Sequence, residues 1–143
     1  MRLAVFSSVF SGLSAYRDAG NMTIYAGCAA DAVEEVIDLC VEELRGLKRS
    51  PVPDAELSRA KDHLKGSLML SLENTASRMS HLARQEIYFE RHFGLDETLA
   101  GVERVTPDDV TRVATDLFSD GSLAATVVGP SPHEMTRTQL DLG

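Results

Sequence analysis

The chain has 143 residues, with 14 Lys or Arg against 22 Asp or Glu, and a formal net charge of −8. Its length suits one domain, and its 43% hydrophobic and 25% charged residues are typical of a globular protein, which excludes extended disorder. The negative charge argues against nucleic-acid binding, and no apolar run reaches the roughly 20 residues of a membrane-spanning helix. We therefore expect a globular protein with no nucleic-acid partner and no membrane span.

The N-terminal segment and the cysteines bear on the cellular compartment. Residues 1–6 begin like a signal peptide, but serines interrupt the apolar run that follows. Cys28 and Cys40 cannot form a metal site alone and do not resemble a disulfide framework, so we expect two buried free thiols. The protein is cytoplasmic by default, and a periplasmic location stays open for a longer precursor.

The first thirty residues predict an antiparallel hairpin. Apolar residues alternate with small or polar ones over residues 3–16, and residues 22–27 alternate again. Between them lies a turn sequence in which Gly20 and Asn21 tolerate positive φ, which lets the chain reverse.

Residues 31–117 predict several helices. Asp31 and Glu34 resemble a capping box at the start of the first helix, and residues 50–53 end it. A second helix begins near Asp54, residues 74–75 mark a bend, and further helices begin at Asp96 and at residues 106–109. The apolar stripes of the first two helices are Val33, Val36, Ile37, Cys40, Leu44 and Leu47, then Leu57, Ala60, Leu64, Leu68 and Leu72.

The apolar run at residues 123–128 predicts a closing strand, which residues 129–132 end. The order of strand, strand, several helices and strand predicts an α+β fold. Its mostly antiparallel sheet, made of the N-terminal hairpin plus the C-terminal strand, is covered on one face by several helices. Three strands are few for so many helices, so the sheet looks incomplete. We expect one domain over residues 1–130 and an irregular tail over residues 131–143.

The titratable and nucleophilic residues form no recognisable catalytic or metal site. No two of the histidines lie three or four residues apart, so neither H-E-x-x-H nor H-x-x-E-H occurs. Ser58 and Lys61 match S-x-x-K, but the companion motifs are absent and a chance match is favoured. The histidines are His63, His81, His92 and His133. We therefore predict no catalytic residue and no metal ligand.

Two charged groups of residues are weak candidates for binding surfaces. The acidic residues between 34 and 43 could attract basic peptides. Arg78, Arg84 and Arg91, spread along one helical segment, could receive acidic or carbonyl groups. For both groups a solvated helix face is the favoured interpretation.

Several segments, in this order, resemble one known family. Residues 8–20 are similar to the hairpin S-V-Y-S-x-x-x-x-Y-x-D-x-G, and residues 24–28 to the strand I-Y-A-G-T/C, of the pitrilysin/insulinase-type zinc metallopeptidases. These enzymes are the inverzincins, which include mitochondrial processing peptidase. The family's later helices and closing strand are matched by residues 56–67, 73–79, 105–110 and 127–130. The resemblance covers nearly the whole chain up to about Pro130.

The resemblance implies a partial peptidase domain. In this family two homologous α+β halves face a peptide-holding chamber: one half binds zinc through H-x-x-E-H and a distal glutamate, and the other is metal-free. Residues 1–130 resemble the carboxy-terminal part of the metal-free half, so a preceding strand and helix would lie elsewhere. The chain is expected to be inactive alone and without a cofactor, with zinc only in the catalytic half.

The same resemblance leaves the substrate-binding residues unknown. The metal-free half usually offers an arginine and a tyrosine, seven residues apart. Phe6 falls at the tyrosine position, and the arginine position falls before Met1. Neither substrate-binding role is therefore assigned to a residue of this sequence.

The function implied is that of a non-catalytic substrate-chamber and partner-binding domain of a zinc-dependent metalloendopeptidase, which presents a strand edge to extended peptides. The expected partners are the catalytic half or a second copy, in a homo-oligomer, and peptide substrates. One alternative is a structural assembly subunit that resembles respiratory-complex core proteins and does not proteolyse. Another is an independent acidic binding module.

Overall fold

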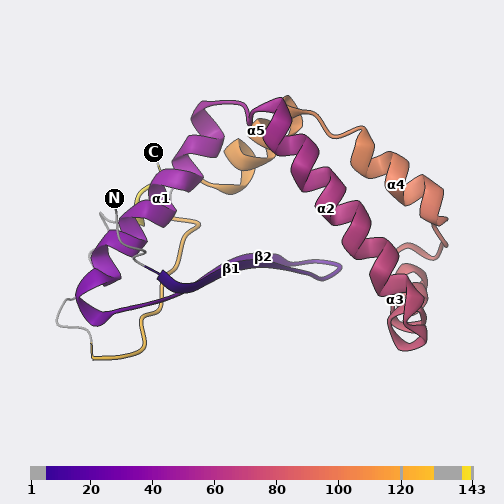
Figure 1. The fold of residues 1–143 in the computed structure, drawn as a ribbon, viewed down its shortest axis with the longest axis horizontal. Helices are drawn as coiled ribbons and strands as arrows, with labels where there is room; N and C mark the ends of the chain where they lie inside the picture. Colours follow the sequence, from indigo (N-terminus) through magenta and orange to yellow (C-terminus); the bar gives the residue numbers. More distant parts are fainter. Residues whose placement is uncertain (1–5, 120, 131–139, 143) are drawn as a thin grey trace. The chain divides into compact units, whose positions relative to one another are not determined.

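The computed structural model describes residues 6–119, 121–130 and 140–142. The chain divides into two compact units, Met1–Ser50 with Thr111–Gly143, and Pro51–Val110. The expected α+β fold is confirmed (Figure 1). In chain order the elements are β1 (Phe6–Ala15), β2 (Gly20–Cys28), the 3-10 turn η1 (Ala30–Ala32), α1 (Val33–Arg49), α2 (Asp54–Glu73), α3 (Thr75–Phe89), α4 (Leu95–Glu103) and α5 (Pro107–Leu117).

The predicted hairpin is confirmed, although its turn differs in detail. β1 and β2 pair antiparallel from Ala15 opposite Gly20 to Ser8 opposite Gly27. The backbone N–H of Tyr16 donates to the carbonyl of Ala19 at 2.8 Å and closes the turn. Gly20 lies within β2, where a Cβ atom would stand 3.0 Å from the Ser14 carbonyl oxygen. Close backbone approach, and not positive φ, therefore favours glycine there.

α1 supplies the core of the first unit. Val41 and Leu44 of α1 are buried together with Leu142, and the partly buried Ile37, Phe118 and Leu123 pack against them. The predicted capping box at Asp31 and Glu34 is wrong, because the chain first forms η1 and α1 begins only at Val33 with no side-chain cap. Asp31 therefore lies inside the 3-10 turn, ahead of the helix.

The predicted closing strand at residues 123–128 is wrong. These residues lie in no regular secondary structure, and the sheet of the described residues contains β1 and β2 only. A run of β-forming residues becomes a strand only where a neighbouring edge pairs its backbone groups. Leu123 instead packs against the α1 core, and Val128 is 94% exposed.

The expected cover of helices over one face of the sheet is not found within the first unit. α1 contacts β2, where Ala26, Gly27 and Cys28 are partly buried. The side chains of β1 from Ser7 to Ala15 are all exposed. Most of the hairpin therefore has both of its faces exposed to solvent.

In the second unit, α2 packs against α3 and against α4, as Figure 1 shows. The predicted bend is confirmed at Asn74, whose side-chain oxygen accepts from the backbone N–H groups of Ala76 and Ser77 at 2.9 and 3.2 Å. This is an N-cap, which satisfies two of the free donors at the start of α3. The predicted start of α5 is also confirmed, since Thr106 and Asp109 bond reciprocally.

No residue of α2 is fully buried, contrary to what its apolar stripe suggests. Leu57, Leu68 and Leu72 are partly buried, whereas Ala60 and Leu64 are exposed. α3 ends at Glu90, which has a left-handed backbone with φ of 51°. Among the described helices, none is both long enough and apolar enough to cross a membrane.

Candidate functional site

Among the residues that the structure describes, β2 is the strand that pairs with β1, and the opposite, free edge of β1 is the first candidate site. In an antiparallel pair, opposite residues alternate between bonded and non-bonded positions. Because Tyr16 bonds to Ala19, this pair is a bonded one, and every second pair along the hairpin is then bonded as well. The bonded pairs are then Ser14 with Asn21, Gly12 with Thr23, and Phe10 with Tyr25. The backbone N–H groups of Val9, Ser11 and Leu13 consequently point away from β2, where an extended peptide can pair with them.

The two faces of the hairpin differ in chemistry. Val9 and Leu13 of β1 share one face with Met22 and Ile24 of β2, and all four are exposed. On the other face Phe10 and Tyr25 stack, with ring centroids 4.8 Å apart. Leu13 is 77% exposed. The hairpin thus offers an aliphatic face and an aromatic pair beside the free edge.

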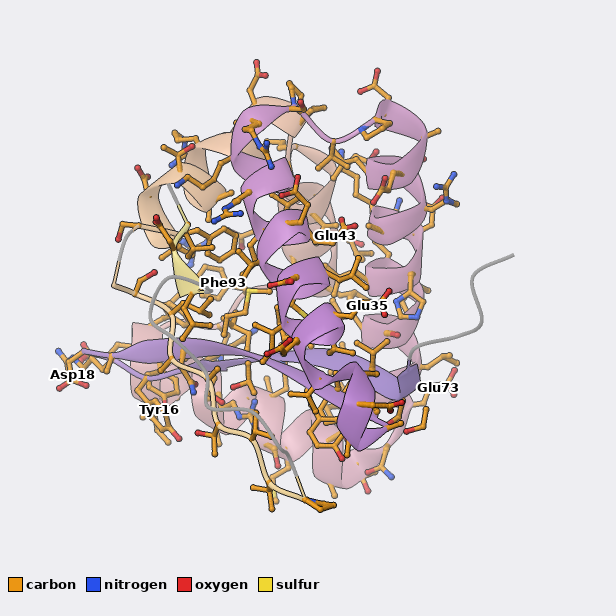
Figure 2. All side chains as sticks on the ribbon, turned by 90° about the vertical axis from the view of Figure 1, so that its left-hand side faces the viewer. Tyr16, Asp18, Glu35, Glu43, Glu73 and Phe93 are labelled. Carbon is orange, nitrogen blue, oxygen red and sulfur yellow. The ribbon has the colours of Figure 1, made fainter. Side chains whose placement is uncertain are left out.

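The hairpin tip carries the polar end of this surface. Figure 2 shows Tyr16 and Asp18 at the turn, away from α1. Both side chains are exposed. An apolar ligand on the hairpin therefore has a hydroxyl and a carboxylate at the tip end.

A groove of about 510 Å³ in the second unit is the other candidate site. Its walls come from α2, α3, the segment between α3 and α4, and the first turn of α4. Apolar side chains line most of it, and its charged or titratable members are Glu73, Arg78, His81 and His92. The apolar lining residues are Leu68, Met69, Leu72, Leu82, Phe93 and Leu95. Such a groove suits an apolar side chain with a neighbouring carbonyl or carboxylate.

Gln85 holds one wall of this groove in place. Its side chain is buried, its Oε1 accepts from the backbone N–H of Phe93 at 3.0 Å, and its Nε2 lies 2.9 Å from the Nε2 of His81. A longer contact of 3.4 Å runs from Nε2 to the Phe93 carbonyl. Because one amide serves both polar groups of Phe93, the segment between α3 and α4 is tied to α3.

The predicted arginine row is only partly correct. Arg78 and Arg84 lie on α3, but Arg91 lies beyond its end. The Arg91 guanidinium stacks over the Phe93 ring at 4.6 Å and pairs with Glu97 at 2.5 Å. α3 stops before Arg91 because Glu90 turns left-handed, which breaks the helical spacing of the three arginines.

The S-x-x-K match brings no serine and lysine together as a nucleophile pair. Lys61 Nζ donates instead to the backbone carbonyl of Glu103 at 2.7 Å, so this ammonium helps to hold α2 against the end of α4. Lys65 pairs with Asp62 and Glu103, at 3.0 Å each. The hydrogen bond that Lys65 donates to Asp62, followed by the one that it donates to Glu103, raises the pKa of Lys65. Both lysines are structural links here.

The described residues do not fit a zinc site. No three His, Cys, Asp or Glu side chains among them are placed to hold a metal ion. His133 lies outside the described residues. The two thiols are free, as expected, but partly rather than fully buried. Burial, and to a smaller degree the Glu43 carboxylate, raises the pKa of Cys40.

The acidic side of α1 is a solvated helix face along much of its length. Glu35 and Glu43, both labelled in Figure 2, are exposed. Glu42 pairs with Arg49 at 2.6 Å. Sequence reasoning missed a different feature of α1, its contact with Leu142, because no periodicity links a residue so distant in the chain to a helix face.

Comparisons with known proteins find one matching protein family and several similar proteins. Residues 2–64 match the model of the family described as the Peptidase M16 inactive domain. Residues 2–64 thus match the inactive domain of the family that the sequence motifs predicted.

Curated relatives extend the match to most of the chain. An uncharacterized zinc protease of Bacillus subtilis is 37% identical over 124 residues, which cover 87% of this chain and 30% of that protein. One of Mycobacterium tuberculosis is 36% identical over 123 residues, 86% of this chain and 28% of that protein. A probable mitochondrial-processing peptidase subunit beta of Arabidopsis thaliana is 28% identical, over 88% of this chain and 24% of that protein. The chain thus spans less than a third of the length of these relatives.

A solved structure supports the fold. A chain of complex III2 from Candida albicans, determined with Inz-5 bound, matches with a TM-score of 0.72 and 22% identity. The match covers 78% of this chain and 27% of that chain. The likeness concerns the fold alone.

Proposed function

We propose that this chain is the non-catalytic, substrate-chamber and partner-binding part of a zinc-dependent metalloendopeptidase. The observation that carries the proposal is the match of residues 2–64 to the inactive domain, since this range contains the whole hairpin. In this role the chain lines the chamber and binds the catalytic half or a second copy. It holds peptides and leaves hydrolysis to the catalytic half.

The free edge of β1 is the physical basis for holding a peptide. The outward N–H groups of Val9, Ser11 and Leu13 can bond an extended chain of any sequence. The aliphatic and aromatic faces can then contact alternate side chains of that peptide. This mode suits a peptidase chamber, in which many different sequences must bind in extended form.

Zinc belongs to the catalytic half in this proposal. The described residues of the chain offer no group that fits the ion. A zinc ion in the partner half would supply the activated water for hydrolysis. The contribution of this chain is to orient the peptide backbone and to exclude water around it.

The proposal is tested by mixing the purified chain with the zinc-bearing half of its protease and measuring turnover of an unstructured peptide. Ser11→Pro removes one outward N–H without touching the bonds to β2, so turnover should fall about tenfold. Ser11→Ala keeps that N–H and should retain turnover. Circular dichroism checks that both variants keep the hairpin and helices.

Two results would overturn the proposal. One is stoichiometric zinc together with peptide turnover in the chain alone. The other is equal turnover of the proline and alanine variants in the reconstituted mixture, because a strand edge that binds peptide must respond to a lost donor.

A structural assembly subunit without proteolysis is the second candidate. The fold likeness to a chain of complex III2 favours it. In that case the chain would form a stable complex with its partner, and the complex would turn over no peptide. Zinc content and peptidase assays on the purified complex distinguish the two functions.

A further inference from the structure

Leu142 is the most buried residue among those described. Only 2% of it is exposed, and it packs in one cluster with Val41 and Leu44 of α1. Leu142 is 98 positions beyond Leu44 in the sequence, so this contact is not a continuation of the helix. A short segment therefore places a leucine into an apolar site on α1.

Two cationic side chains of α1 bind the backbone of the same segment. Arg45 Nη2 donates to the carbonyl oxygen of Asp141 at 2.6 Å, and Lys48 Nζ donates to that of Leu142 at 3.0 Å. A hydrogen bond to a carbonyl group contributes more binding free energy when its donor is charged than when its donor is neutral. The contacts with α1 thus include one side chain and two consecutive carbonyl groups of the segment.

This combination is the recognition pattern of a peptide-binding site. An apolar site selects one side chain, and the fixed donors read backbone groups that every peptide carries. Both donors lie on α1, within about one turn of Leu44. Ile37 of α1 and the non-α1 residues Phe118 and Leu123 pack against the same apolar cluster.

We propose that the α1 face of Val41, Leu44, Arg45 and Lys48 is a peptide-binding site whose ligand is the segment 140–142, and that a second copy of this chain can supply that segment. The site takes a short segment with leucine at the position of Leu142. It lies on α1 and is independent of the β1 edge. Two chains that exchange the segments would be linked at this face.

The test uses a fluorescent peptide with the sequence of residues 136–143 and measures its anisotropy with the full-length chain. Leu142→Asp in the chain removes the resident leucine from the site, so this variant should bind the peptide at least about tenfold more tightly than the unmodified chain. Replacing Arg45 and Lys48 by Gln in the Leu142→Asp chain should weaken binding about tenfold or more.

Matched controls exclude non-specific binding and misfolding. A peptide in which the residue equivalent to Leu142 is Asp should lose at least about tenfold in affinity. A second host, which lacks residues 140–143, replaces the Leu142→Asp chain if that variant loses its helical circular dichroism. Arg49→Gln, on α1 but with its side chain paired to Glu42, should leave peptide affinity unchanged.

The proposal is overturned if neither host binds the peptide up to about 1 mM, an affinity of roughly −4 kcal/mol. Equal affinity of the unmodified chain and both hosts for the peptide would also overturn it, because the segment 140–142 of the unmodified chain must compete with the peptide for the site. None of these measurements involves the catalytic half or peptide hydrolysis. Failure here is therefore distinguishable from failure of the proposed chamber function.

Discussion

Gln85→Met tests whether one buried amide holds the segment between α3 and α4. Methionine keeps nearly the same volume, so packing changes little and the loss concerns hydrogen bonds. The 3.0 Å bond from the Phe93 N–H has no replacement in the variant. A net hydrogen bond contributes about 1 kcal/mol, and an unsatisfied buried donor costs about 1–3 kcal/mol. We expect a total loss of about 2–3 kcal/mol.

Native-state amide exchange is the appropriate assay, because it reports opening at Phe93 itself. A loss of about 2–3 kcal/mol corresponds to exchange about 30- to 150-fold faster, since each 1.4 kcal/mol is a factor of ten. Arg84→Met, on the adjacent exposed position of α3, is the control and should leave the exchange of Phe93 unchanged. Acceleration below about threefold in Gln85→Met would refute the assigned role of Gln85.

Three further predictions concern caps, core and titration. Asn74→Ala should lower the free energy of unfolding by about 1 kcal/mol in urea titrations, whereas Asn74→Asp, which keeps an acceptor, should not. Val41→Ala should cost about 2 kcal/mol by the same measurement, and Val128→Ala, at an exposed position, less than about 0.5 kcal/mol. Because burial raises the pKa of Cys40, the unfolded thiol, with its pKa near 9.0, loses its proton first. The stability that Cys40 contributes is therefore complete below pH 9 and falls as pH rises through the folded pKa, a slope that Cys40→Ser should remove in urea titrations. A pH slope above 9 that is identical in both proteins would contradict this.

The elements that could be predicted from the sequence are those set by nearby residues. Alternation and a turn sequence sufficed for the hairpin. The bend predicted at residues 74–75 and the helix start predicted at residues 106–109 are also found, each with a local side-chain cap. The family motifs added the class of protein, and the match of residues 2–64 to the inactive domain confirms it.

Other features of the fold depend on contacts that sequence periodicity does not reveal. Residues 123–128 have strand propensity, but in the described part of the chain no neighbouring edge pairs with them. In the sequence, Gln85 looks like an ordinary polar helix residue. Its role follows only from its hydrogen bond with Phe93 in the folded chain. Leu142 lies in a stretch without periodicity, and only its contact with α1 makes it a core residue. In the proposed function the edge of β1 binds peptide through backbone groups, which carry no sequence signal.

Glu90, the left-handed residue that ends α3, and the bond between Gln85 and Phe93 act on the same segment of the groove wall. Glu90 carries a Cβ atom, so its positive φ costs about 1 kcal/mol that glycine would not pay. The bond between Gln85 and Phe93 holds the next few residues in the path that this conformation begins. Glu90→Gly in the Gln85→Met protein should therefore slow the amide exchange of Phe93 by about fivefold. If the effects of the two substitutions are additive in a double-mutant cycle, the two positions are not coupled. The conformation of the groove wall thus depends both on a local backbone penalty at Glu90 and on the side-chain amide of Gln85.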